Sequence, residues 1–264
     1  MNLNIQSKTA FISGSTQGIG YAIAEQLLSE GANVIINGRT ESKVQQAVSL
    51  LKQQFPQSVV LGGTADLSQA EQVNRLITNL PKIDILVNNA GVFELKPFFH
   101  ITEEDWLHVF QINVLSSVRL ARALMPAMLE RNWGRIIFIS SEAGINIPEQ
   151  MIHYGMTKTA LISLNNGLAK LTKGSCVTVN AIVGGPTYSD GVSTTINHLA
   201  QEQNQTVESI KQNLMQHLNP TSLIGRFIEP EEIAALTAYL CSPKAAIING
   251  AALRADGGVL NTML

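Results

Sequence analysis

Charged side chains are scarce in this chain, and long apolar runs are missing. Only 14% of the 264 residues are charged and the formal net charge is −2, so we expect no basic surface for nucleic acid or anionic membranes. No apolar run reaches the roughly 18 residues of a membrane span. The first residues also lack the charged start and apolar stretch of a signal peptide. The sequence therefore predicts a cytoplasmic protein without a nucleic-acid or membrane partner.

Cysteine is nearly absent, and the histidines are not arranged as metal ligands. Cys176 and Cys241 lie far apart and outside any CxxC pair, which is typical of a reducing compartment. The five histidines lack the short spacings that zinc sites use. They are His100, His108, His153, His198 and His217. We therefore expect no metal site.

The chain does contain a regular alternation of strand and helix patterns. Continuous Val and Ile runs predict strands buried on both faces, at residues 8–13, 33–37, 58–63, 84–89, 135–140 and 176–182, with a short last strand within 250–258. Amphipathic stretches between them predict helices, for example at 18–30, 41–55 and 229–243. This order predicts one α/β domain over residues 1–264, a Rossmann-type doubly wound parallel sheet of about seven strands with helices on both faces.

One region interrupts the alternation. Residues 184–222 are polar and long for a connection, although 206–217 has the pattern of a helix. Long connections inside compact domains are commonly functional lids or binding loops. We therefore expect a substrate lid at about 184–222.

A glycine-rich turn, "SGSTQGIG", follows the first strand and opens the first helix. In this context Gly14 permits a tight turn, Gly18 lets the backbone approach a pyrophosphate, and Gly20 allows close helix packing. A glycine-rich turn without a ligand is the alternative. The residues expected to bind a dinucleotide here are Gly14, Ser15, Thr16, Gln17, Gly18, Ile19 and Gly20.

The end of the second strand bears on the choice of cofactor. The stretch "VIINGRT" has no Asp or Glu to accept a hydrogen bond from the ribose 2′-hydroxyl of NAD. Arg39 follows the strand instead and can pair a 2′-phosphate through two parallel hydrogen bonds, although a solvated loop arginine is the alternative. Gln17 offers no second charge. NADP is therefore the predicted cofactor, and NAD stays possible.

The stretch "HYGMTK", at residues 153–158, contains the candidate acid–base residues. Tyr154 and Lys158 are one helical turn apart and share a face. A free tyrosine, with a pKa near ~10, is a poor acid–base at neutral pH, and a nearby ammonium would lower that pKa by about 1–3 units. Ser141 at a strand end can donate to a carbonyl oxygen as negative charge develops there. Asn113 can hold a water that connects Lys158 to solvent.

These motifs, with "NNAG" at 88–91, occur in an order and spacing that resemble the short-chain dehydrogenases/reductases of the compact single-domain type. The resemblance covers the chain from Lys8 to about Gly258. It implies that the catalytic four are Asn113, Ser141, Tyr154 and Lys158. It also implies cofactor contacts from Asn88, Ala90 and Gly91 beside the ribose, from Asp66 and Leu67 at the adenine, and from Thr187, Tyr154 and Lys158 near the nicotinamide. Assembly as a homotetramer through long helices at 103–131 and 152–173 is a further implication.

The chain departs from the family pattern after the sixth strand. Gly184 stands where the family usually has proline, so we expect a looser turn there. Thr187 is still expected to reach the carboxamide, and Ser189 to lie near the phosphates. Glu142, next to Ser141, either faces solvent or repels anionic substrates. His153 points in a different helical direction from Tyr154, and we expect no catalytic role for it.

The predicted function is hydride transfer between NADP and a ketone or secondary alcohol. The substrate wall is expected from residues 93–99, 142–153 and the lid. A 3-oxoacyl thioester reductase is an alternative, weakened because no cluster of Arg and Lys suggests docking of an acidic carrier. A non-catalytic dinucleotide-binding sensor is another, and the intact catalytic four argues against it.

Overall fold

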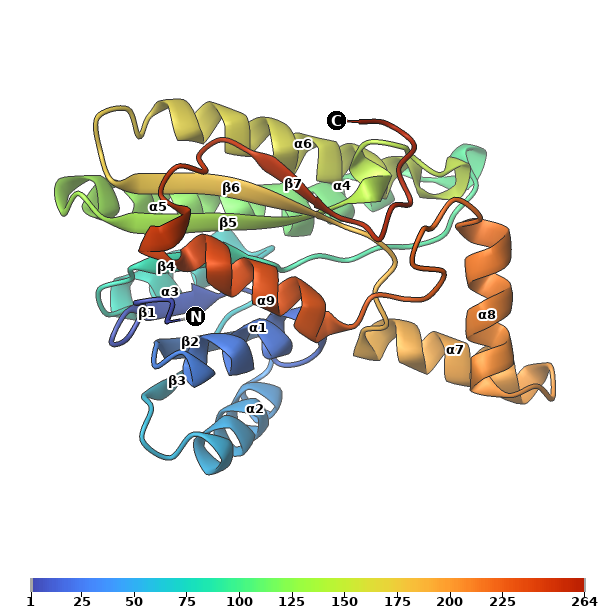
Figure 1. Cartoon of the computed structure of the whole chain (residues 1–264), viewed down its shortest axis with the longest axis horizontal. Coiled ribbons are helices and arrows are strands. Elements are labelled where there is room, and N and C mark those ends of the chain that lie inside the picture. The colour runs from blue at the N-terminus through green and yellow to red at the C-terminus, as the bar shows by residue number, and fades with distance from the viewer. Residues whose placement is uncertain (1, 264) are drawn as a thin grey trace.

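A single parallel sheet of seven strands forms the centre of the molecule. The computed structural model describes residues 2–263, and its strands run in the order β3-β2-β1-β4-β5-β6-β7 (Figure 1). The strands are β1 (Thr9–Ile12), β2 (Asn33–Gly38), β3 (Val60–Thr64), β4 (Ile85–Asn88), β5 (Gly134–Ser141), β6 (Val177–Gly184) and β7 (Ala252–Ala255). Every neighbouring pair is parallel. The predicted fold class is confirmed.

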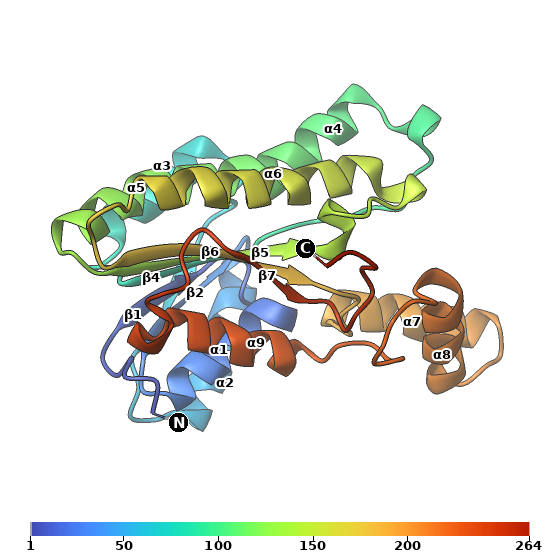
Figure 2. The ribbon, with the colours of Figure 1, turned by 45° about the horizontal axis from the view of Figure 1, so that its top comes forward.

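Helices cover both faces of this sheet. The α-helices in chain order are α1 (Gly18–Ser29), α2 (Glu41–Gln54), α3 (Ala70–Asn79), α4 (Glu103–Phe110), α5 (Ser116–Glu130), α6 (Ile152–Lys170), α7 (Asp190–Glu202), α8 (Val207–Leu218) and α9 (Pro230–Cys241), of which α7 and α8 lie off the sheet faces. One apolar core lies between the sheet and α1, α2 and α9, and a second lies between the sheet and α3, α5 and α6. Figure 2 shows these two layers on opposite sides of the strands.

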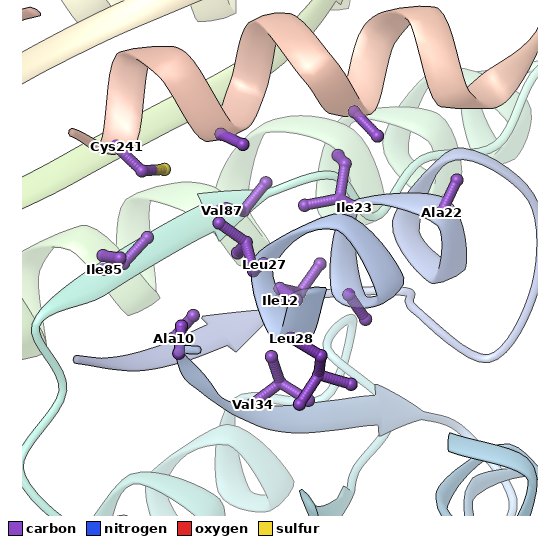
Figure 3. Close-up of a cluster of buried hydrophobic side chains, with 14 of the residues drawn as sticks. Ala10, Ile12, Ala22, Ile23, Leu27, Leu28, Val34, Ile85, Val87 and Cys241 are labelled. Atoms are coloured by element: carbon purple, nitrogen blue, oxygen red, sulfur yellow. The ribbon is translucent and has the colours of Figure 1, made fainter. Parts of the chain in front are cut away.

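The first core explains the Val and Ile runs of the sequence. Ile12, Val34 and Val87, on three neighbouring strands, are completely buried under Ile23 and Leu27 of α1 (Figure 3). Because the opposite face of each strand is covered too, neither face needs polar side chains, and the strands read as unbroken apolar runs. Polar side chains are few inside the strands, Thr178 and Asn180 of β6 being examples, and the carboxyl ends of the parallel strands share one edge of the sheet.

The predicted long helix at 103–131 is continuous but not regular. A π-helical turn at Gln111–Leu115 separates α4 from α5, and Asn113 lies in this turn. Such turns are rare and frequently mark functional sites. By length and composition alone Glu103–Glu130 would be able to cross a membrane. Within this segment, 50% of the most apolar 18-residue stretch is buried inside the fold, and α5 packs on β4 and β5. This is expected of a core helix.

The lid differs from the sequence prediction, because most of it is helical. Helix α8 matches the pattern at 206–217, but α7 was not predicted. The two helices lie beyond the carboxyl end of β6 (Figure 1) and share a small apolar cluster. The cluster comprises Ile196, Ala200, Ile210, Met215 and Phe227. In α7 the apolar residues Val192, Ile196, Leu199 and Ala200 recur at helical spacing, so the signal was present in the sequence although polar residues surround it.

The expected loosening at Gly184 is wrong. Gly184 is the last residue of β6 and is paired with both Ser141 of β5 and Ala255 of β7, so the strand holds it on both sides. A Cβ atom at this position would make only ordinary contacts. The next residue, Gly185, is the constrained one: a Cβ there would lie 2.6 Å from the carbonyl oxygen of Asp256. Close packing against the chain after β7 therefore requires glycine at 185.

Candidate active site

A cavity of about 580 Å³ lies at the carboxyl ends of the strands. It sits where the strand order reverses, between β1 and β4, which is where open α/β sheets bind ligands. Arg39 and Lys43, which follow β2, line one end. Because β5 and β6 lie on the other side of β1, their neighbours Ser141, Tyr154 and Lys158 line the opposite end. One cavity thus connects the residues that the sequence predicts for cofactor selection with the residues that it predicts for catalysis.

The glycine-rich turn forms the floor between these ends. Gly14 and Gly18 both have φ of +60°, a conformation that side-chain-bearing residues rarely adopt. A Cβ on Gly14 would lie 2.9 Å from the Cα of Ala90, and one on Gly20 would lie 2.5 Å from the carbonyl oxygen of Gly14. A side chain at any of these three positions would thus clash with the backbone or require an unfavourable φ. The first turn of α1 presents its free N–H groups to the cavity.

An acidic side chain already occupies this anion-binding position. Asp190, the first residue of α7, accepts a hydrogen bond from the Gly18 N–H through Oδ2 at 2.5 Å. The carboxylate stands in for a phosphate oxygen at the positive end of α1. The turn would therefore suit the pyrophosphate of a dinucleotide, and Asp190 would compete with it for the Gly18 N–H. Asp190 was not predicted, because only the tertiary fold brings the lid to the turn.

The reactive end is built from β5 and α6. Lys158 donates from Nζ to the carbonyl oxygen of Ile139 at 2.9 Å, and its Nζ lies 5.5 Å from the centre of the Tyr154 ring. Ser141 donates from Oγ to Oε2 of Glu142 at 2.6 Å and accepts from the Ala143 N–H at 3.1 Å. The register of β5 and the helical period of α6 thus bring hydroxyl, phenol and amine together at one end of the cavity.

Comparison with known proteins agrees with this geometry. A family model described as short chain dehydrogenase matches residues 8–203 of the chain. The chain belongs to the short-chain dehydrogenase/reductase family. It is therefore an oxidoreductase of a family that uses NAD(P), as the sequence resemblance implied.

Similar members of the family differ in what their names report. The oxidoreductase YvaG of Bacillus subtilis (strain 168) is 46% identical over 263 residues, covering 100% of both chains. A D-beta-hydroxybutyrate dehydrogenase of Cupriavidus necator is 32% identical, covering 96% of this chain and 98% of the relative. The L-sorbose reductase of Gluconobacter frateurii, solved with NADPH and L-sorbose, superposes with a TM-score of 0.93 at 31% identity over 100% of both chains.

In this dehydrogenase/reductase Asn113 lies behind the cavity wall rather than in it. Its Oδ1 accepts from the Val92 N–H at 2.8 Å, and its Nδ2 donates to the Val92 carbonyl and to Oγ1 of Thr157. These bonds tie the chain after β4 to α6. Gly91 lies beside Asn113 and Lys158, and a Cβ there would make only ordinary contacts with them, at 3.5 Å from Oδ1 and Nζ. The water-holding role of Asn113 stays a prediction.

The "NNAG" segment is placed differently from the expectation for its first asparagine. Asn88 is buried at the end of β4, has no hydrogen-bond partner for its side chain within residues 2–263, and does not line the cavity. Asn89 does line it, donating from Nδ2 to the carbonyl oxygens of Ser13 and Gly14. Successive residues of a strand face opposite ways, so the neighbour takes the position. Ala90 and Gly91 line the cavity as predicted.

Most of the other predicted cofactor residues also line the cavity. These are Gly14, Thr16, Gln17, Gly18, Ile19, Arg39, Asp66, Leu67, Tyr154, Lys158 and Thr187. Ser15 and Gly20 do not. Ser15 is buried beneath the turn, where its hydroxyl donates to the carbonyl of Ile12 and accepts from the Asn37 N–H. Its role here is to hold the turn against β2.

The ribose end carries a second cation that sequence reasoning missed. Lys43, in the first turn of α2, lines the cavity together with Arg39. Gly38 ends β2, and a Cβ there would lie 2.6 Å from Cγ2 of Thr16, so the position has no room for an acidic side chain. Two cations and no carboxylate on β2 suit a 2′-phosphate. A signal was available, since Lys43 follows Arg39 by four residues at a helix start.

The expected lowering of the Tyr154 pKa is wrong. Burial raises the pKa of Tyr154 above its ordinary value, the Glu142 carboxylate raises it further, and a hydrogen bond with Ser141 opposes them. Burial lowers the pKa of Lys158 to about 8, against the opposing effect of Glu142. The lysine ammonium is directed to the Ile139 carbonyl instead of the phenol. Tyr154 therefore keeps its proton at neutral pH and is equipped to act as an acid.

Removing the negative charge of Asp190 is expected to strengthen dinucleotide binding. In Asp190→Asn the side chain no longer repels the pyrophosphate and competes less well for the Gly18 N–H, so affinity for NADPH should rise about tenfold, or ~1.4 kcal/mol. Titration of nicotinamide fluorescence measures this. Asp190→Glu keeps the charge and serves as the control. Weaker binding by Asp190→Asn would mean that the carboxylate supports the bound state.

Proposed function

We propose that this protein is an NADPH-dependent reductase that converts a neutral ketone to a secondary alcohol. The observation that carries the proposal is that one cavity has Arg39 and Lys43 at one end and Ser141, Tyr154 and Lys158 at the other. The two cations, and the lack of room for an acidic side chain at Gly38, favour the 2′-phosphate of NADPH. The NADPH found in the L-sorbose reductase, at 31% identity, points the same way.

The protonation of the site favours reduction over oxidation. A bound nicotinamide cofactor supplies the hydride that reduces the carbonyl carbon. The Ser141 and Tyr154 hydroxyls hold the carbonyl oxygen, where negative charge develops. Tyr154 then transfers its proton to that oxygen, so one hydride and one proton convert C=O to CH–OH. The ammonium of Lys158 stabilises the tyrosinate left behind until solvent returns the proton.

A cofactor titration followed by a turnover assay tests the proposal. The fluorescence of NADPH is expected to increase on binding at low micromolar protein concentration. NADPH should bind at least about tenfold more tightly than NADH, because each charged hydrogen bond to the 2′-phosphate is worth about 1.5–3 kcal/mol. Steady consumption of NADPH with ketones then separates an enzyme from a sensor. Absence of binding by either nucleotide would remove the enzyme proposal altogether.

The segment at residues 93–99 gives no support to the thioester reductase. Lys96, the lone cation of residues 93–99, is hydrogen-bonded to Asp105 and so is already neutralised. An acidic carrier protein would require free cations in this segment. The end of the cavity beside Phe93, where Lys158 already lies next to Glu142, is better suited to a small neutral ketone.

We also infer a cytoplasmic homotetramer with no nucleic-acid or membrane partner. Helices α4, α5 and α6 form one outer layer (Figure 2), and large apolar side chains on it are exposed. They include Leu107 on α4 and Met156 on α6. A second copy packed on this layer would cover them. Light scattering from the purified protein checks the assembly, and a monomer would contradict it.

A further inference from the structure

Glu142 places a carboxylate directly beside the reactive groups. It follows the end of β5 and lines the cavity together with Ser141, Tyr154 and Lys158. The side chain is turned inward, toward Ser141, and not out to solvent. Of the two roles that the sequence leaves open for Glu142, the half-buried position beside Ser141 favours an effect on the substrate over a purely solvent-facing carboxylate.

The hydrogen bonds of Ser141 create a conflict with its expected role. A serine hydroxyl has one proton to donate. That proton goes to Oε2 of Glu142 at 2.6 Å, while the oxygen accepts from the Ala143 N–H. Ser141 therefore has no donor left for a carbonyl oxygen as long as Glu142 accepts it.

We propose that Glu142 selects ketones that carry a hydroxyl group on the carbon next to the carbonyl. The substrate hydroxyl donates to the Glu142 carboxylate in place of Ser141, and the Ser141 proton turns to the carbonyl oxygen. A plain ketone offers no such donor and leaves Ser141 engaged. The inference rests on the proposed reductase function and names the substrate class for it.

The geometry of the pair matches this class of substrate. Oxygens on neighbouring carbons of a hydroxyketone lie about one hydrogen-bond length apart, and Ser141 Oγ and Glu142 Oε2 are separated by 2.6 Å. The two protein groups can thus engage the two substrate oxygens side by side. Phe93 and Met151 line the same cavity and provide apolar surface for the carbon chain.

The charges around Glu142 favour a neutral hydroxyl over an ammonium or a carboxylate. Lys158, buried in the same site, already supplies a positive charge that interacts with Glu142. A cationic ligand would add a second positive charge beside it. Asp256 adds negative charge near Glu142, which disfavours anionic substrates. Burial raises the pKa of Glu142, and a donated hydrogen bond replaces part of the hydration that its carboxylate loses.

The reaction balances without a further reactant. The carbonyl carbon gains a hydride, its oxygen gains the Tyr154 proton, and the product is a vicinal diol. The hydroxyl proton shared with Glu142 stays on the substrate oxygen throughout. Glu142 thus acts on selection and on the orientation of Ser141, and it transfers no proton itself.

Three ketones of nearly equal size test the inference. The probes are 1-hydroxy-2-butanone, its methyl ether 1-methoxy-2-butanone, and 3-pentanone. The ether keeps the electron-withdrawing oxygen but has no proton to donate. With NADPH, the wild-type kcat/KM is expected to be about 100-fold higher for the hydroxyketone than for the ether, because a buried acceptor left unpaired is costly.

Variants at Glu142 make the test specific. In Glu142→Ala the ratio between hydroxyketone and ether should fall to within about threefold, and the rate with 3-pentanone should rise as Ser141 is released. Such a gain cannot come from misfolding. Glu142→Asp should restore part of the preference. Glu130→Ala, which removes an exposed carboxylate at the end of α5, is the matched control and should change nothing.

The outcomes separate the inference from the proposed function. Equal wild-type rates with hydroxyketone and ether, or an unchanged ratio in Glu142→Ala, would overturn the role of Glu142 and leave a reductase. Failure to reduce any of the three ketones while NADPH is bound would overturn the substrate class. Failure to bind NADPH would remove the proposed function as well.

Discussion

Tyr154→Phe is expected to bind NADPH as tightly as the wild type and to lose ketone reduction by about 10³-fold. The ring remains packed edge-on against Phe93, with their centroids 6.1 Å apart, so the cavity keeps its shape. Only the proton donor is removed, and general acid catalysis contributes about 10²–10⁴-fold to such reactions. Because burial and Glu142 raise the pKa of Tyr154, no neutral-pH population of tyrosinate competes with this role.

Stopped-flow or steady-state loss of NADPH absorbance measures this effect, with fluorescence titration measuring the binding. Tyr239→Phe is a matched control, since Tyr239 packs against the core beneath α9 and lies outside the residues that line the cavity. It should leave both quantities unchanged. A Tyr154→Phe enzyme with near-normal turnover would exclude Tyr154 as the proton donor.

Replacing both cations at the ribose end is expected to reverse the cofactor preference. In Arg39→Asp with Lys43→Ala, NADPH should bind about 100-fold more weakly, since two charge-assisted contacts to its 2′-phosphate are lost, or ~3 kcal/mol. NADH, which has no 2′-phosphate, should bind as well as before or better, because the new carboxylate can accept from its ribose hydroxyl.

Parallel titrations with both nucleotides test this prediction. Lys52→Ala removes an exposed cation from the last turn of the same helix, α2, and is expected to affect neither nucleotide. Equal weakening of NADPH and NADH in the double variant would mean that the two residues hold the structure of the site. Unchanged NADPH binding would remove them from cofactor selection.

The sheet and the reactive pair were predictable because their signals are local. Burial on both faces leaves an unbroken apolar run, so the predicted strand limits agree with β1 to β7 within two or three residues. The period of an α-helix alone puts Tyr154 and Lys158 on one face. Neither inference required knowledge of what lies across the fold.

The features that were missed depend on distant parts of the chain. Asp190 reaches Gly18 across 172 residues of sequence. The placement of Asn89 instead of Asn88 depends on where β4 ends, and a one-residue difference moves a side chain to the other face. The direction of the Tyr154 pKa shift was wrong because it follows from burial and from Glu142, and only the folded site supplies either.

The strand order also separates two properties that an engineer or natural selection would want to change independently. Between the ends of β2 and β5 lie β1 and β4, so three strand spacings, or about 14 Å, divide the cation pair from Glu142. Substitutions this far apart with no shared partner usually act additively. Between them the glycine turn tolerates no side chain at Gly14, Gly18 or Gly20. With the roles proposed for the cation pair and for Glu142, cofactor choice and substrate choice are expected to be separable, so that a substitution at one end of the cavity leaves the preference set at the other end unchanged.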